Sequence, residues 1–426
     1  MKRSPLAIIL LTVFIALIGF GIVIPLIPVY AERYGASGTE VGFLIMVYSL
    51  MQFIFAPLAG RLSDKIGRRP VLIAALIITS SSYVLFALAH SLHALFISRI
   101  LAGLGGADIT VAQAYIADVT PPEKRARGMG LFGAAFGVGF VVGPALTGFT
   151  APIVEWLPAA IAAGFAGTTA IIAFVLLPEP STRAERSSRK GKDPFHATKP
   201  VVILSSVYFL VTLAVTQFQA MIVLFTLKLF GWGAAKNGLF LAGFATLGAV
   251  IQGGFMGKLA SRFGERKLAR TGLILIGLGL LVAGNSGPLI PERATQHFAP
   301  TLAEFLSGTG KLWVMFAGAA IYSVGFAVTI PPLSSQISQQ APKGRQGQAL
   351  GVYQSSGSLG RIIGPVAGGF LFDHIGIGAP MLTGGLIALI TGIATFYLFA
   401  GTEWVGLASD HEGEPATINE TDFPVS

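Results

Sequence analysis

Long apolar runs alternate with short polar breaks along this chain. Each run is close to the ~20 residues that an α-helix needs to cross the hydrocarbon core of a bilayer. The pattern therefore predicts an all-α membrane protein with twelve transmembrane helices. The predicted spans are residues 6–30, 40–60, 70–89, 94–117, 128–149, 156–177, 201–227, 237–257, 268–284, 312–338, 347–372 and 379–400.

The composition agrees with this pattern and excludes a soluble enzyme of ordinary composition. Of the 426 residues, 53% are hydrophobic and only 12% are charged, whereas soluble domains carry about 25% charged residues. The chain has no cysteine, which excludes disulfides, thiolate metal sites and cysteine nucleophiles. No acid–base pair or nucleophile constellation falls within a span, so we expect no enzymatic activity, no cofactor and no metal.

The net charge of +9 follows from the topology. With the N-terminus in the cytoplasm, 22 of the 29 Lys and Arg residues fall in inner segments and 5 in outer segments, while Arg99 and Arg361 lie within spans. Such an inner excess of cations is typical of membrane proteins. It predicts a multi-pass protein of the inner (plasma) membrane with both termini in the cytoplasm, and it removes the support for a nucleic-acid partner.

A basic, polar stretch divides the spans six and six. The predicted parts are an N-terminal six-helix bundle (1–178), a cytoplasmic linker (179–200), a C-terminal six-helix bundle (201–402) with an outer loop at 285–311, and an acidic cytoplasmic tail (403–426). The halves repeat each other, because "GRLSDKIGRRP" from Gly60 aligns with "GKLASRFGERK" from Gly257. Parallel repeats predict a transporter whose site lies between the halves, near the midplane.

Four motifs, in order, resemble the major facilitator superfamily and, within it, the twelve-helix drug–proton antiporters that include the tetracycline exporters. They are "GFGIVIPLIPVY" in the first span, "GRLSDKIGRRP", "RILAGLGGADITVAQAYIAD" from Arg99 and "GFVVGPALTG" from Gly139. The resemblance implies two pseudo-symmetric six-helix bundles and export of a drug in exchange for protons. Tetracycline exporters carry acids in helices one and nine, where this chain has Ala16 and Ile276, and this difference argues against tetracycline as the substrate.

Of the 20 acidic residues, Asp108 alone lies deep within a predicted span. A carboxylate there is costly when ionised, so it takes up a proton or finds a partner. We expect Asp108 to couple transport to protons; the alternative is a neutral acid bonded to a neighbouring helix. Arg99 matches an arginine associated with coupling in proton-driven relatives, although a straight helix would place it about 13.5 Å from Asp108 along the axis. Its alternative role is a structural cation held by carbonyl groups of helix one.

A polar stripe on helix eleven is predicted to line the substrate cavity. It consists of Gln354, Ser358 and Arg361. Arg361 would bind an anionic group of the substrate or neutralise Asp108 across the cavity; alternatively it is a packing cation bonded to a carbonyl. Four further side chains would add hydrogen bonds in this cavity, with hydrogen bonding between helices as the alternative for each: Tyr48, Gln52, Gln219 and Gln252.

The loop between helices two and three is predicted to form a conformational latch. Asp64 would bond the N-terminus of helix eleven, near Gln348 and Ala349, when the halves close at the inner end. Arg68, Arg69 and Arg127 would pair with Asp64, Asp118 or Glu179, next to the loop glycines Gly60 and Gly67. The motifs of helices five and eleven would allow close packing, and the Gly-Pro pair of helix five would bend or thin that helix: Gly139, Gly143, Pro144, Gly364 and Pro365.

These features favour a secondary active transporter, expected as a monomer in the lipid bilayer, that exports an amphipathic or lipophilic small molecule against proton entry. Two alternatives remain open. One is a lipid or glycolipid flippase on the same fold, since Arg361 and the outer loop would suit a head group. The other is a non-transporting membrane receptor or scaffold that uses the acidic tail.

Overall fold

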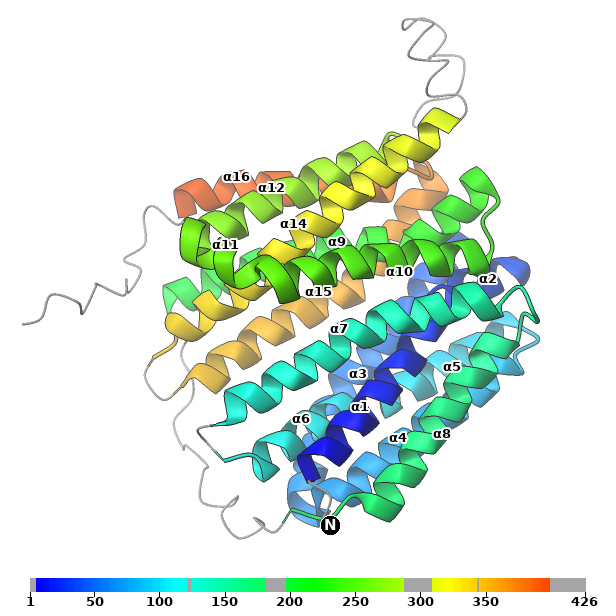
Figure 1. Cartoon of the computed structure of the whole chain (residues 1–426). Helices are drawn as coiled ribbons and strands as arrows, with labels where there is room; N and C mark the ends of the chain where they lie inside the picture. Colours follow the sequence, from blue (N-terminus) through cyan, green and yellow to red (C-terminus); the bar gives the residue numbers. More distant parts are fainter. Residues whose placement is uncertain (1–4, 122–123, 181–196, 287–308, 343–344, 399–426) are drawn as a thin grey trace, which may run out of the picture.

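The computed structural model describes residues 5–398, apart from 122–123, 181–196, 287–308 and 343–344. These described residues form helices and no strand (Figure 1). The predicted tail, most of the predicted linker and most of the predicted outer loop lie outside the described residues.

The first six predicted spans form eight helices, because spans one and four are each interrupted. They are α1 (Pro5–Val23), α2 (Leu26–Arg33), α3 (Gly38–Ile66), α4 (Arg68–Ala87), α5 (Leu92–Gly105), α6 (Asp108–Val119), α7 (Arg125–Thr150) and α8 (Leu157–Leu176). The interruption between α1 and α2 falls at Pro25, whose ring removes the amide hydrogen that would continue the helix.

The last six predicted spans also form helices, one of them with a π-helical turn. They are α9 (Lys199–Phe230), α10 (Ala234–Val250), the π-helical turn η3 (Ile251–Phe255), α11 (Met256–Phe263), α12 (Glu265–Gly284), α14 (Thr309–Gln339), α15 (Gln346–His374) and α16 (Ala379–Leu398). The eighth predicted span comprises α10, η3 and α11.

Among the described residues, eleven helical segments are long and apolar enough to cross a membrane. The predicted eleventh span, α15, is 29 residues long but is not one of these segments, because glutamines, serines and Arg361 lower its hydropathy. It packs against α9 and α3. Its polar residues therefore fit a helix that faces protein as well as lipid.

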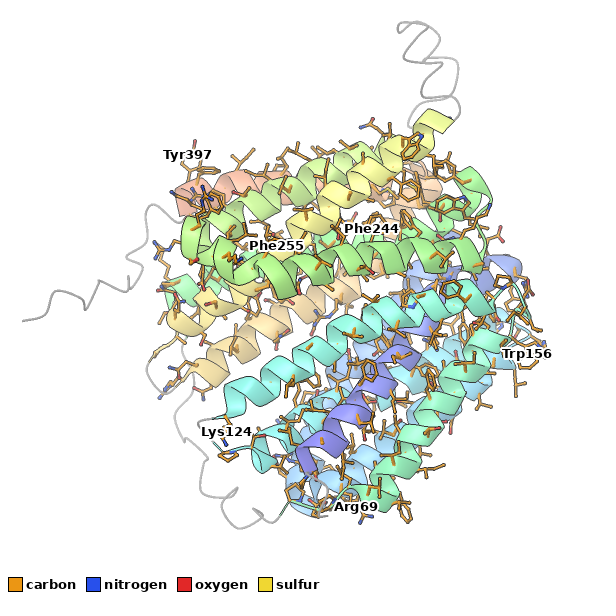
Figure 2. The ribbon with its side chains drawn as sticks, viewed as in Figure 1. Arg69, Lys124, Trp156, Phe244, Phe255 and Tyr397 are labelled. Carbon is orange, nitrogen blue, oxygen red and sulfur yellow. The ribbon has the colours of Figure 1, made fainter. Side chains whose placement is uncertain are left out.

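The outer surface of the bundle is apolar between its ends. On α8, for example, Ile171, Phe174 and Val175 are all strongly exposed. Two amphipathic aromatic residues are exposed near helix ends: Trp156 is 55% exposed and Tyr397 is 79% exposed, at opposite ends of the bundle (Figure 2). Tryptophan and tyrosine favour this position at the membrane interface.

Helices pack closely where glycines face each other. In the second half, Gly272 and Gly325, and then Gly279 and Gly318, bring α12 against α14. A Cβ atom at Gly325 would lie 2.6 Å from the backbone nitrogen of Ile276. Small residues at such contacts let two backbones approach, which is a main source of helix association in membranes.

The two halves meet at one end of the molecule. A Cβ atom at Gly42 of α3 would collide with the Pro365 carbonyl of α15, and one at Gly238 of α10 would lie 2.5 Å from the Pro144 carbonyl of α7. Toward the opposite ends of α3, α7 and α15, and in α11, which continues the line of α10, four glycines have no neighbour within 4 Å of such a Cβ: Gly60, Gly130, Gly351 and Gly257. Figure 1 shows α7 and α10 separating toward the left. The halves thus touch at the predicted outer end and part at the predicted cytoplasmic end.

The α12–α14 contact gives a prediction about stability. We expect Gly325→Ala to lower the free energy of unfolding by about 1–3 kcal/mol, as overpacking does in a filled core. Gly243→Ala is the matched control, since Gly243 also lies within a helix but has nothing within 4 Å of the added carbon. Thermal unfolding of the purified protein in detergent measures both. Equal stability of the two variants would contradict the close contact.

Candidate functional site

Asp108 lies at a break in the fourth predicted span. Helix α5 ends at Gly105 and α6 begins at Asp108, so the fourth predicted span, 94–117, consists of two helices rather than one. The turn between them includes Gly106, whose carbonyl accepts a hydrogen bond of 3.1 Å from the Gln52 side chain of α3. A polar partner from a neighbouring helix is what makes irregular backbone tolerable within a membrane bundle.

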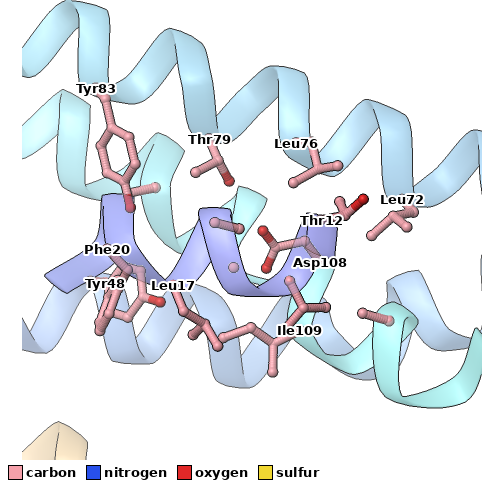
Figure 3. A pocket seen from close by; sticks show the side chains of 15 residues that line it. Thr12, Leu17, Phe20, Tyr48, Leu72, Leu76, Thr79, Tyr83, Asp108 and Ile109 are labelled. Carbon is pink, nitrogen blue, oxygen red and sulfur yellow. The ribbon is translucent and has the colours of Figure 1, made fainter. Parts of the chain in front are cut away.

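The Asp108 carboxyl faces a small pocket inside the first half. Its walls come from α1, α3, α4, α5 and α6, and Figure 3 shows the carboxyl among the Thr12, Thr79 and Leu76 side chains. Asp108 is 8% exposed. The pocket volume is about 30 Å³, and a water molecule needs about 10–15 Å³ on this measure. The pocket therefore has room for water but not for a drug-sized ligand, which needs roughly 300 Å³ or more.

No cation pairs with Asp108 among the described residues. Its carboxyl interacts with the backbone N–H of Ile109, at the start of α6, where the helix dipole favours negative charge. Two phenol side chains, Tyr48 and Tyr83, line the same pocket and lie within electrostatic range of Asp108. The group is thus held by a helix terminus and polar neighbours rather than by an ion pair.

Arg99 is a buried cation with an incomplete set of partners. It is 2% exposed, and its guanidinium lies 4.9 Å from the centre of the Phe86 ring. Its Nε donates to the Ser98 hydroxyl at 3.5 Å, while its Nη2 has no hydrogen-bond partner in the described part of the chain. The expected carbonyl groups of helix one are not among its described partners, so an aromatic face takes the place predicted for them.

Arg361 lies on the predicted polar stripe of α15. Its Nη2 donates to the Ser358 hydroxyl at 2.9 Å, and that hydroxyl donates to the Gln354 carbonyl at 3.0 Å. One turn further along, Pro365 meets α3. Arg361 lies within electrostatic range of Tyr48 in the first half. The expected neutralisation of Asp108 by Arg361 is wrong for this conformation, because the described residues form no such pair.

The other predicted cavity residues lie in different parts of the molecule and do not form one site. Gln52 bonds the α5–α6 break and approaches the Tyr48 hydroxyl at 3.5 Å. Gln219 donates to the Tyr322 hydroxyl at 3.2 Å, within the second half. Gln252 is exposed in the π-helical turn. The structure therefore brings Tyr48 and Gln52 to the region of Asp108 but not Gln219 or Gln252.

The predicted latch residues form a compact cluster within the first half. Arg68 contacts Asp64 at 2.7 Å and Asp118 at 2.9 Å. The Glu179 carboxylate accepts hydrogen bonds from the backbone N–H groups of Arg68 and Arg69, at 2.6 and 2.8 Å. This cluster joins the ends of α3, α4 and α6 to the segment after α8.

The predicted bond between Asp64 and the N-terminus of α15 is absent from the described contacts. Asp64 pairs with Arg68 instead, and the N-terminus of α15 has no side-chain cap. Gly347 and Gly351, in its first turns, have open space around them. The physical reason is that the halves are apart at this end. The side chain of Arg127 lies outside the described residues.

The helix-five motif packs α7 against α1. A Cβ atom at Gly143 would lie 2.6 Å from the Cα of Gly21, and one at Gly139 would lie 2.8 Å from the Cβ of Leu17. Helix α7 continues through Pro144 without a break, so the Gly-Pro pair interrupts no helix. In the second half, Gly364 lies against Thr216 of α9. These residues set helix spacing.

Of the residues that line the Asp108 pocket, only Asp108 and Tyr48 were predicted as site residues. Those that were not predicted include Thr79, Tyr83 and Ala16. Thr79 and Tyr83 are ordinary polar residues of a span and give no local signal. Ala16 gives one: the resemblance to tetracycline exporters implies an acid at this position of helix one, and the structure places Ala16 in the same pocket as Asp108.

Comparison with known proteins places this arrangement among transporters. The chain matches the Major Facilitator Superfamily over residues 9–290 and 247–420. It is 31% identical to Multidrug resistance protein 1 of Bacillus subtilis (strain 168) over 381 residues, which cover 87% of this chain and 90% of that one. It is 32% identical to the class D Tetracycline resistance protein of Salmonella ordonez, over 87% of this chain and 90% of the relative.

Solved structures share the fold. The human organic anion transporter MFSD10 (TETRAN) superposes with a TM-score of 0.66 at 24% identity, over 92% of this chain and 99% of that chain. The nucleoside transporter NupG gives a TM-score of 0.72 at 10% identity, over 94% and 100% of the two chains. The helical fold, the motifs and these matches lead to one conclusion: the chain is a multi-pass membrane protein that belongs to the major facilitator superfamily of transporters.

Proposed function

We propose that this protein exports an amphipathic or lipophilic small molecule from the cytoplasm in exchange for protons. The relatives named as multidrug and tetracycline resistance proteins support a drug as substrate and export as the direction. The excess of cations in the predicted inner segments supports a bacterial inner-membrane location with both termini in the cytoplasm. The halves would then enclose a cavity open to the cytoplasm.

The observation that carries the proposal is the enclosed carboxyl of Asp108 at the start of α6. Burial opposes its ionised form, whereas the helix dipole and the Ile109 N–H favour it. Because these effects oppose each other, the group is suited to gain and lose a proton as access alternates. Discontinuous helices hold coupling sites in other transporter folds as well.

The proton site and the substrate site would be separate but adjacent. The pocket at Asp108 suits water, so a drug would bind in the larger space between the halves, beside the stripe that ends at Arg361. Tyr48 lines the pocket of Asp108 and belongs to α3, which packs against α15, the helix of Arg361. We propose that a change of charge at Asp108 moves Tyr48 and so alters the substrate site.

Asp108 provides the first test of this function. We expect Asp108→Asn to abolish substrate-dependent proton movement, because an asparagine amide neither gains nor loses a proton at the pH of the assay. The variant should still insert into the membrane. The measurement is dye export in inverted vesicles with and without a pH gradient. Ala16→Asp in the Asp108→Asn background should restore part of the activity, since Ala16 faces the same pocket. Unchanged proton-driven export by Asp108→Asn would refute the assignment.

Arg361 gives a second prediction. Replacement by glutamine removes a charge-assisted donor, which typically contributes about 1.5–3 kcal/mol, so we expect the KM for the exported compound to rise about tenfold or more. Arg361→Lys should retain part of the affinity. Gln252→Ala is the control because Gln252 is exposed and outside this stripe. A scrambling assay with fluorescent lipids, run in parallel, distinguishes drug export from lipid flipping.

The inner latch gives a third prediction. If Asp64 must bond the N-terminus of α15 when the inner side closes, Asp64→Asn should slow transport several-fold and leave membrane insertion intact. Ser261 occupies the equivalent place in the second half, and Ser261→Ala is the matched control. Transport at the wild-type rate in Asp64→Asn vesicles would remove Asp64 from the mechanism.

A further inference from the structure

A carboxylate of the second half caps a helix of the first half at the predicted outer end. Asp373, in the last turn of α15, accepts hydrogen bonds from the backbone N–H of Gly38 at 2.8 Å and from the backbone N–H of Thr39 at 2.7 Å. The Thr39 hydroxyl donates to the same carboxylate at 2.7 Å. These short bonds to an ionised group are of the strong, charge-assisted kind.

This contact completes the N-terminus of α3. The first amides of a helix have no acceptor within it. Ser37 accepts the amide of Glu40, and the Glu40 carboxylate accepts the amide of Ser37, in a capping box. The amides of Gly38 and Thr39, between them, bond only to Asp373 among the described residues. Half of the cap of α3 is therefore supplied by the opposite half of the protein.

Helices α3 and α15 run antiparallel and are matched in length. Gly38 lies against Gly369, whereas Gly42 lies against Pro365. Residue numbers therefore increase along α3 while they decrease along α15. Each helix has 29 residues. Each helix carries an acidic residue near its C-terminus, Asp64 in α3 and Asp373 in α15. Because the helices are antiparallel and equally long, each acid lies at the level of the N-terminus of the other helix.

We propose that Asp373 is the outer latch of the transport cycle, and that it exchanges with Asp64: the Asp373 cap on α3 holds the outer side closed, and its release accompanies formation of the Asp64 cap on α15. In the present conformation the outer cap is made, while Asp64 is turned to Arg68 and α15 lacks a side-chain cap. This inference rests on alternating access under the proposed function, but not on the identity of the proton site.

The charged groups around this latch are few. His374 follows Asp373 on α15 and bonds the Phe370 carbonyl. Lys228 of α9 lies over the Phe372 ring at 5.8 Å, and Glu40 of α3 is held in the capping box. None of them replaces Asp373 as acceptor for Gly38 and Thr39. Asp373→Asn removes the charge and puts an NH2 donor in place of one carboxylate oxygen, so at least one of the three donors from Gly38 and Thr39 is left to water.

The experiment measures the conformation directly. Because the chain has no native cysteine, spin labels can be attached to introduced pairs: Glu32→Cys with Lys236→Cys across the outer end, and Gly130→Cys with Gly257→Cys across the inner end. All four positions are exposed. Pulsed electron paramagnetic resonance on the full chain in lipid nanodiscs then reports both distances, without substrate or a proton gradient.

We expect Asp373→Asn to lengthen the outer distance and shorten the inner one, with the outer-open population rising about tenfold, equivalent to about 1.4 kcal/mol. Thr39→Val removes one of the three bonds and should give a smaller shift in the same direction. Glu40→Gln is the matched control: it alters a carboxylate at the same helix end that bonds only its own half, and it should leave both distances unchanged.

Unchanged distances in both Asp373→Asn and Thr39→Val would overturn the latch, and equal shifts in Glu40→Gln would show general destabilisation of the helix end instead. Adding Asp64→Asn to Asp373→Asn tests the exchange, since the inner distance should lengthen again. These outcomes do not depend on Asp108. Failure of proton-driven export would leave the latch standing, and failure of the latch would leave the proton site untouched.

Discussion

Inside a bilayer, each backbone amide and carbonyl must find its partner within the protein, because the hydrocarbon offers none. This constraint accounts for the helical architecture and for where it is interrupted. The break between α5 and α6 lies within the first half, where Gln52 bonds the Gly106 carbonyl. The same break gives Asp108 a helix terminus to face. Asp108, the acid predicted deep within a span, thus lies where the α-helical hydrogen bonding of span four is interrupted.

The sequence predicted the helices well because each span is long and apolar. The run at 347–372 was predicted in the same way, although the polar residues of α15 keep that helix out of the eleven most apolar segments. It did not predict the break at Asp108. The glycines from Gly103 to Gly106 fit close packing equally well, and Gly103 does pack tightly, against Tyr48 and Met51. Local sequence could not separate packing from interruption, since one run of glycines serves both.

The buried charges show a second limit of sequence reasoning. Their place within spans followed from the sequence alone, but their partners depend on how the side chains pack in the folded protein. Arg99 lies against Phe86 rather than against carbonyl groups, and Arg361 bonds Ser358 of its own helix rather than Asp108. Asp373 was missed because it lies one residue beyond the predicted span and looks like an ordinary end-of-helix acid. Its partners, Gly38 and Thr39, are more than 300 residues away in the chain.

Two latches on one helix pair also suit the energetics of alternating access. A transporter cycles only if the free energies of its two conformations differ by no more than a few kcal/mol. Neither conformation can therefore form all of the favourable contacts. Between Asp64 and Asp373, α3 and α15 approach each other through backbone at Gly38, Gly42 and Gly369, because glycine places no side chain between the two helices. If capping at one end is exchanged for capping at the other, as proposed, the number of strong bonds would stay nearly constant. The small remaining difference would then be open to control by a single protonation or a single bound substrate.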